Sequence, residues 1–156
     1  MTKPKLIQEL QSRCISLNTY AEQLLGDDRF TVSETKYSVL TVELSVRDLG
    51  FTDGATTERI FAKAAELGLA LCPLELTPHW RLQYLDQTEG HSEAEAQGHQ
   101  APSGSVTVAS EPLSADDDFP KGFYLRRIDG VLWLRGYRAD RLHVWNAHDR
   151  FVFMKE

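Results

Sequence analysis

The residues most suited to chemistry lie in one stretch, FYLRRIDGVLWLRGYR at 123–138, where arginines alternate with aromatic rings. Asp129 and Gly130 separate two alternating runs, a pattern typical of a β-hairpin closed by a two-residue type I′ turn. Counting outward from that turn places the leucines on one face, which we expect to belong to the core. The opposite face would carry Tyr124, Arg126, Trp133, Arg135 and Tyr137.

Guanidinium groups and aromatic rings on one sheet face allow two interpretations. They can stack on each other across the strands, which stabilises a sheet by roughly 0.2–1 kcal/mol per pair and needs no ligand. They can also bind a phosphate, an acidic peptide or a nucleic-acid base. From residue 121 to 141 six basic residues stand against two acidic ones, a local charge of +4. Such a patch could bind an acidic partner or attract the protein's own acidic segment at 114–118.

A second candidate surface lies in HWRLQYLD, residues 79–86, which alternates as an extended segment does. In a strand Arg81 and Gln83 would share a face, because side chains alternate with a period of two. We expect an ordinary solvated strand face, with the alternative that these two residues extend the hairpin surface or line a polar cavity if the sheet curls.

Residue groups that would indicate catalysis are scarce. The sequence contains no phosphate-binding loop, no G-x-S-x-G and no zinc-ligand spacing. His143, Asn146, His148 and Asp149 lie close together near the C-terminus, but on a strand a five-residue spacing directs the two histidines to opposite faces. We expect no cofactor and no metal, and favour a protein that is not an enzyme.

A seven-residue apolar repeat predicts that residues 5–25 form one helix. The repeat consists of Ile7, Cys14 and Ala21 in one row and Leu10, Leu17 and Leu24 in the other. The helix could lay this stripe on the protein's own sheet, or it could form a short coiled coil and make the protein a dimer.

The rest of the chain predicts an α+β fold. Residues 40–46 alternate as a half-buried strand, and a helix follows from an N-cap at Thr56 to a glycine stop at Gly68. The segments at 69–76 and 79–86 are predicted to be extended. Residues 87–104 contain no large apolar side chain and are predicted to be a flexible loop. With the C-terminal strands as a meander, we expect a curved antiparallel sheet of five to seven strands and one further helix.

Composition limits the function classes. The chain of 156 residues suits one domain, and 42% hydrophobic with 26% charged residues is ordinary for a globular protein. A net charge of −6 argues against a protein that coats nucleic acid, although a local basic patch keeps a nucleic-acid accessory role as an alternative. Two cysteines, no secretory signal and no apolar run of about 18 residues predict a cytoplasmic protein that is not in a membrane.

The motifs LGFTDGAT, LGLALCPLEL, RLQYLDQ, WLRGYRAD and DRFVF resemble those of a family of small bacterial proteins without an assigned activity. These are packing and turn motifs, so the resemblance implies a bacterial cytosolic α+β protein and assigns no catalytic residue. We therefore expect a non-catalytic binding or accessory domain that uses the aromatic and arginine face of the hairpin for an acidic protein or another anionic ligand. The alternatives are a nucleic-acid accessory factor and a small enzyme acting on an anionic metabolite.

Overall fold

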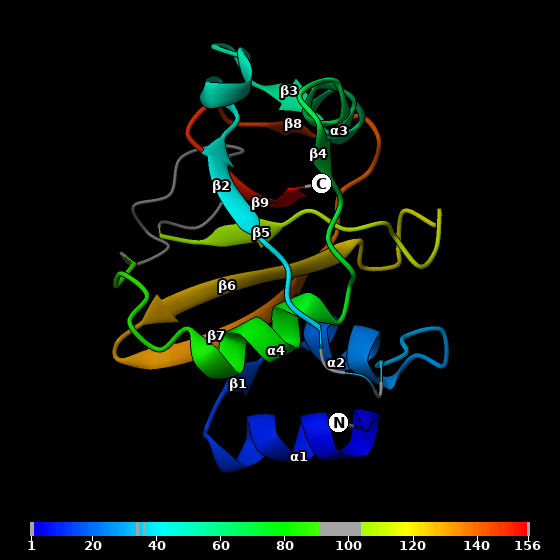
Figure 1. Cartoon of the computed structure of the whole chain (residues 1–156), viewed down its shortest axis with the longest axis vertical. Helices are drawn as coiled ribbons and strands as arrows, with labels where there is room; N and C mark the ends of the chain where they lie inside the picture. Colours follow the sequence, from blue (N-terminus) through cyan, green and yellow to red (C-terminus); the bar gives the residue numbers. More distant parts are fainter. Residues whose placement is uncertain (1, 34, 36, 91–103, 156) are drawn as a thin grey trace.

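The computed structural model describes residues 2–33, 35, 37–90 and 104–155. In chain order its elements are α1 (Lys3–Ser12), β1 (Ser16–Leu17), α2 (Thr19–Gly26), β2 (Thr41–Ser45), the 3₁₀ helix η1 (Arg47–Leu49), β3 (Ala55–Thr56), α3 (Thr57–Glu66), β4 (Leu69–Ala70), α4 (Leu76–Gln83), β5 (Val106–Val108), β6 (Gly122–Ile128), β7 (Val131–Tyr137), β8 (Val144–Trp145) and β9 (Arg150–Lys155). Helices and a mixed sheet are combined as Figure 1 shows, so the predicted α+β class is confirmed.

The prediction of one helix over residues 5–25 is wrong, because the segment forms α1 and α2 with β1 between them. α1 ends at Ser12, and Cys14 then takes a left-handed φ of 59° that a helix cannot accommodate. Asn18 starts α2 by accepting the N–H of Ala21 at 2.8 Å. The asparagine N-cap interrupts an apolar repeat that otherwise continues through the break.

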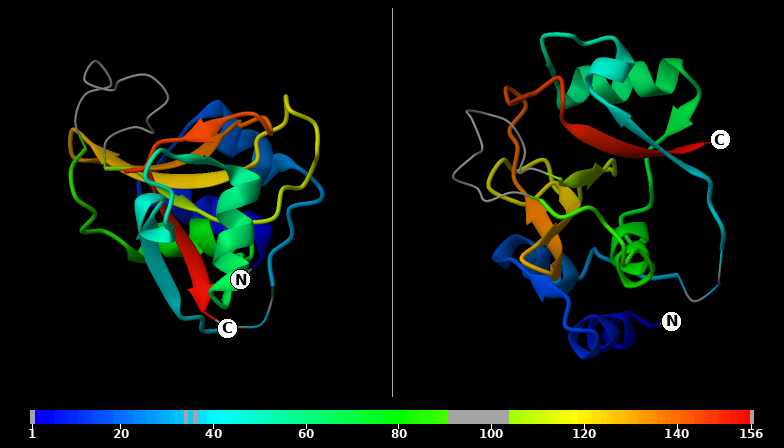
Figure 2. Two further views of the ribbon diagram at one scale, coloured as in Figure 1. Left: turned by 90° about the horizontal axis from the view of Figure 1, so that it is seen from above. Right: turned by 90° about the vertical axis from the view of Figure 1, so that its left-hand side faces the viewer.

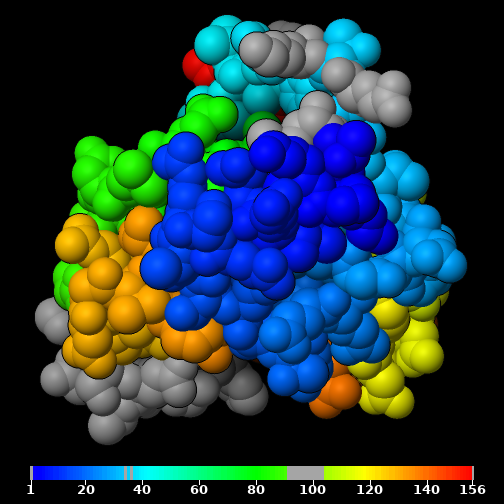
Figure 3. All heavy atoms as spheres, turned by 90° about the horizontal axis from the view of Figure 1, so that it is seen from below, coloured from blue at the N-terminus to red at the C-terminus, as the bar shows by residue number. Residues whose placement is uncertain are grey.

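The apolar rows of this segment serve the protein's own core. Leu10, Ala21 and Leu24 are buried, whereas Cys14 is exposed. Figure 3 shows the N-terminal segment in blue covering one face of the molecule. The interpretation in which the stripe packs on the sheet therefore accounts for these rows, and the continuous helix on which the predicted dimer depended does not form.

The main sheet has seven strands in the order β1-β7-β6-β5-β9-β2, with β4 also paired to β9. The number of strands is as predicted, but β1 pairs with β7 and β5 pairs with β9 in parallel, so the sheet is mixed. The expected C-terminal meander ends after the β6–β7 hairpin. β8 leaves to pair with β3 in a small second sheet, and β9 pairs with β5 and β2.

The described residues form three apolar clusters, and the two larger ones lie in the two halves of the structure, whose ribbon Figure 2 shows from two further sides. The first lies between the hairpin and the N-terminal helices and includes Leu6, Leu10, Leu24, Phe30, Phe123, Leu125 and Leu134. The second lies under α3 and includes Ile60, Ala64, Trp145, Phe151 and Phe153. The short strand β5 joins the halves, because it pairs with β6 on one side and with β9 on the other.

α3 forms where the sequence predicts it. Thr56 is its N-cap and accepts the N–H of Arg59 at 3.5 Å. Gly68 follows the helix with a left-handed φ of 79°, which glycine adopts without strain. Both capping signals are thus confirmed.

The segment 79–86 is mainly helical, not extended, so that prediction is wrong. α4 begins at Leu76, and Pro78 lies in its first turn, where a missing N–H costs no hydrogen bond. On a helix two residues apart point in nearly opposite directions. Arg81 is accordingly buried, whereas Gln83 is exposed. No helix among the described residues is long and apolar enough to cross a membrane.

Candidate functional site

The hairpin forms with the predicted register. Arg126 pairs with Trp133, and Tyr124 pairs with Arg135. Asp129 and Gly130 both have positive φ, of 52° and 77°, as a type I′ turn requires. The inner face is core, as expected, because its leucine and phenylalanine side chains belong to the first apolar cluster.

The aromatic and arginine face of the hairpin is a packed ladder more than an open platform. The guanidinium of Arg135 lies 5.2 Å from the centre of the Trp133 ring and 5.6 Å from that of Tyr124. Arg126 is 1% exposed and Tyr124 is 9% exposed. Neither side chain can therefore contact a partner in this conformation. Trp133 and Arg135 are half-exposed.

Tyr137, the last candidate on this face, packs inward. Its ring meets the edge of Trp145 at a centroid distance of 5.4 Å. A tyrosine phenol is protonated at neutral pH in any case, and burial raises the pKa of this one further. It connects the hairpin to the second core and presents no ionised group to a ligand.

Two cations of the basic patch pair with the protein's own acids. Arg127 Nε lies 3.1 Å from a carboxylate oxygen of Glu89, and Arg138 lies 3.9 Å from Asp118. Lys121 Nζ donates to backbone oxygens in the segment 114–118. These contacts agree with the interpretation in which the acidic segment satisfies the patch.

Arg81 is fully buried, and all of its described hydrogen-bond partners are neutral oxygens. Its Nη1 donates to Gln87 Oε1 at 2.6 Å and to the Trp133 carbonyl at 3.2 Å, and its Nη2 donates to the carbonyl of Tyr84. Burial lowers the pKa of the guanidinium to about 10, which leaves it charged at neutral pH. Arg81 therefore connects α4 to β7 through its hydrogen bond to the Trp133 carbonyl. It does not line a cavity together with Gln83.

The first residues of the predicted loop at 87–104 are irregular in conformation and are anchored to the hairpin by hydrogen bonds. Gln87 is 1% exposed, and its amide donates to the carbonyls of Gly104 and Leu125 at 3.1 and 2.9 Å. Gly90 donates to the carbonyl of Arg127 at 2.7 Å. Residues 91–103 lie outside the described part of the chain.

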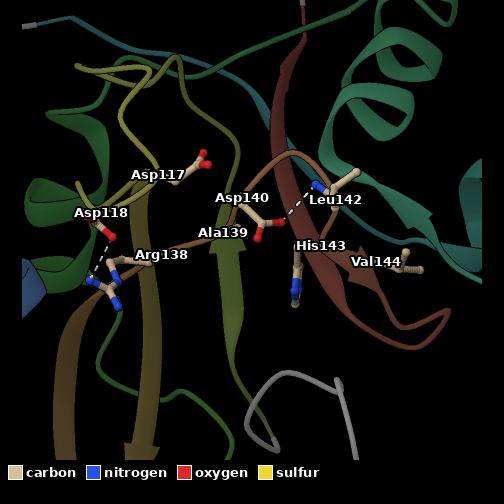
Figure 4. A pocket seen from close by; sticks show the side chains of 8 residues that line it. All are labelled: Asp117, Asp118, Arg138, Ala139, Asp140, Leu142, His143 and Val144. Carbon is tan, nitrogen blue, oxygen red and sulfur yellow. Dashed lines mark hydrogen bonds and ion pairs between the residues drawn. The ribbon is translucent and has the colours of Figure 1, made fainter.

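A surface hollow lies at the open end of the hairpin, opposite its turn. Gly122 pairs with Tyr137, so the segment that enters β6 and the segment that leaves β7 emerge side by side. The hollow between them has a volume of about 580 Å³, within the range of roughly 300–1,000 Å³ typical of ligand sites. Its lining, drawn in Figure 4, consists of Asp117, Asp118, Arg138, Ala139, Asp140, Leu142, His143 and Val144.

The lining contains three carboxylates, those of Asp117, Asp118 and Asp140, and one guanidinium, that of Arg138. Arg138 is engaged by Asp118 and by the ring of Tyr20, whose centre lies 5.2 Å from the guanidinium. Asp140 Oδ1 accepts the backbone N–H of Leu142 at 2.9 Å, which shapes the turn that carries this leucine. The hollow is therefore negatively charged at its rim.

Apolar side chains remain in solvent at the same place. Leu142 keeps 77% of its area exposed and Val144 keeps 46%. The backbone below them is held firmly, because Trp145 Nε1 donates to Thr57 Oγ1 at 2.7 Å. A Cβ on Gly54 would lie 2.2 Å from the Trp145 carbonyl, so only glycine permits β3 and β8 to approach as they do.

The polar groups of the hollow do not converge as a catalytic set. In Figure 4 the His143 ring points away from the Asp140 carboxylate, and Asp117 points away from Arg138. His143 instead packs edge-on against Trp145 at 4.9 Å. The neighbouring Asp149 caps a turn by accepting the N–H of Asn146. Among the described residues no group of three potential metal ligands occurs.

Sequence reasoning missed the hollow because its two sides are 20 residues or more apart in the chain. One signal was available. In RADRLHV, Leu142 follows three charged residues. Charged residues are mostly exposed, so an apolar residue among them is expected to lie at the surface as well. Its exposure becomes evident only with the fold.

No protein-family model matches the chain, and neither a curated protein nor a solved structure matches it. The resemblance to small bacterial proteins therefore stays a prediction. The geometry of the described residues has to carry any functional conclusion.

Proposed function

We propose that this protein is a non-catalytic binding domain, and that the hollow at the open end of the hairpin is its recognition surface. The exposure of Leu142 and Val144 within a concave, charged rim carries the proposal. Apolar side chains left in solvent beside a hollow are typical of surfaces that bind a partner. The turn that holds Leu142 outward is fixed by Asp140, so the exposure is built into the local structure.

The described residues of the hollow do not form a converging acid–base set, which favours binding over catalysis. General acid–base chemistry needs a proton donor and acceptor within hydrogen-bond reach of one reacting atom. In Figure 4 His143 and the carboxylates point in different directions. The aromatic and arginine face of the hairpin remains a secondary candidate for an anionic partner, through the half-exposed Trp133 and Arg135.

Capture from a cell lysate with a matched pair of variants tests the proposal. The test variant replaces Leu142 and Val144 by serine, and the control replaces Leu40 and Leu85, which are 73% and 52% exposed, by serine. Because all four residues are exposed, Val144 least at 46%, we expect each variant to fold with a stability within about 1 kcal/mol of wild type.

We expect wild type and the control variant to capture a partner that the test variant does not capture. The purified partner should then bind wild type and the control more tightly than it binds the test variant. Retention by the test variant at the wild-type level would overturn the hollow as the recognition surface. Loss from a Trp133→Ala, Arg135→Ala variant instead would move the site to the hairpin face.

A further inference from the structure

The charge of the hollow narrows the class of its partner. Resting on the proposed function, we propose that the hollow binds a peptide segment of another protein in which lysine or arginine flanks an aliphatic side chain. The aliphatic side chain would cover Leu142 and Val144, and the cations would meet Asp117 and Asp140. The following observations lead to this partner.

Two carboxylates of the rim have no cation of their own among the described residues. The Asp117 side chain forms no hydrogen bond or ion pair with the described residues, and the carboxylate of Asp140 accepts from them only the N–H of Leu142. Asp118 differs, because it already faces Arg138. Charge complementarity therefore favours a cationic partner at Asp117 and Asp140, and disfavours the anionic ligand expected from the hairpin sequence.

The apolar area beside Asp140, on the side away from Asp117 in Figure 4, requires more than a cation. Leu142 is 77% exposed and Val144 is 46% exposed. Covering them stabilises a complex when an apolar group of the partner displaces the water around them. A peptide supplies both groups on neighbouring residues. A volume of about 580 Å³ has room for a few side chains, which a short peptide segment can supply.

The probe is a library of random short peptides displayed on phage, selected on immobilised wild-type protein. Peptides that also bind the Leu142→Ser, Val144→Ser variant are removed. We expect the retained sequences to be enriched in lysine or arginine next to leucine, isoleucine or valine. Retained sequences that are acidic or uncharged would overturn this inference and leave the proposed function standing.

Other outcomes separate the two proposals further. If no peptide distinguishes wild type from the serine variant, both the proposed function and this inference fall. Sedimentation of the concentrated protein adds a second criterion. Self-association that the serine variant abolishes would make a second copy of this chain the occupant, and would overturn the inference.

Charge-only variants provide the quantitative readout. Asp117→Asn removes a carboxylate without breaking a described contact, and Asp140→Asn keeps an oxygen that can accept the Leu142 N–H. We expect each substitution to weaken binding of a selected peptide by up to about fivefold and to reduce its salt dependence. The control, Asp86→Asn, removes the same single charge elsewhere and should leave affinity unchanged. Equal weakening by test and control would show that only net charge matters, which overturns the inference.

Discussion

Replacing Arg81 tests how a buried cation is tolerated without a carboxylate among the described residues. Its guanidinium donates to three neutral oxygens, on Gln87, Trp133 and Tyr84. An alanine would remove the arginine donor from one buried and two partly buried oxygens, at roughly 1–3 kcal/mol each where water does not replace it. Partial rehydration lowers the sum, so we expect Arg81→Ala to lower the free energy of unfolding by about 4 kcal/mol.

Urea denaturation followed by circular dichroism measures this loss. With a slope of about 2 kcal/mol per molar urea, a loss of about 4 kcal/mol moves the midpoint down by about 2 M. The matched control is Arg59→Ala. Arg59 is exposed and lies 5.0 Å from the centre of the Phe51 ring, so its loss should move the midpoint by less than about 0.5 M.

A methionine at position 81 separates hydrogen bonding from the cost of burying charge. Methionine fills similar space and removes the desolvation of the guanidinium, but it leaves the same oxygens without a donor. We therefore expect Arg81→Met to lose at least about 2 kcal/mol. Wild-type stability in Arg81→Met would refute the reasoning, because the hydrogen bonds would then only offset the cost of burying the cation.

Three further predictions concern single sites. A Cβ at Gly136 would lie 2.7 Å from the backbone of α2, so Gly136→Ala should lower the free energy of unfolding by roughly 1–3 kcal/mol, and an unchanged urea midpoint would contradict the close approach. Hydrogen bonds from Arg29 lower the pKa of Asp27 to about 2, so its carboxyl should titrate near that value by NMR and move toward 3.8 in Arg29→Ala. Since this pKa is depressed by folding, the stability that Asp27 contributes is present above pH 3.8 and is lost as pH falls through about 2. Burial raises the pKa of Cys72 to about 12, so a thiol reagent should label the exposed Cys14 at once and Cys72 only on unfolding. Rapid labelling of both thiols in the folded protein would show that Cys72 is not buried.

Elements with local signals were predictable from the sequence. Asp129 and Gly130 determine the hairpin turn and, by counting, the whole register of β6 and β7. Thr56 and Gly68 bound α3 for the same reason, because a cap acts through its own backbone neighbours. None of these features depends on what packs against the element.

Features that depend on tertiary contacts were not predictable in the same way. α4 carries a charged residue, Arg81, at its most buried position, so the apolar pattern of a helix is missing from its sequence. The hairpin register likewise does not say what covers each face, and the structure buries Arg126 on the face expected in solvent. The hollow required the pairing of Gly122 with Tyr137, which brings its two sides together.

The most direct test of the recognition surface is an amide NMR spectrum of the ¹⁵N-labelled protein, with and without a peptide selected on it. The measurement reports which backbone groups change environment, without presuming a site. We expect the largest shifts at Asp117, Asp118 and residues 138–144 at the hollow. Shifts concentrated at Trp133 and Arg135, with the hollow unchanged, would contradict the account and assign binding to the hairpin face.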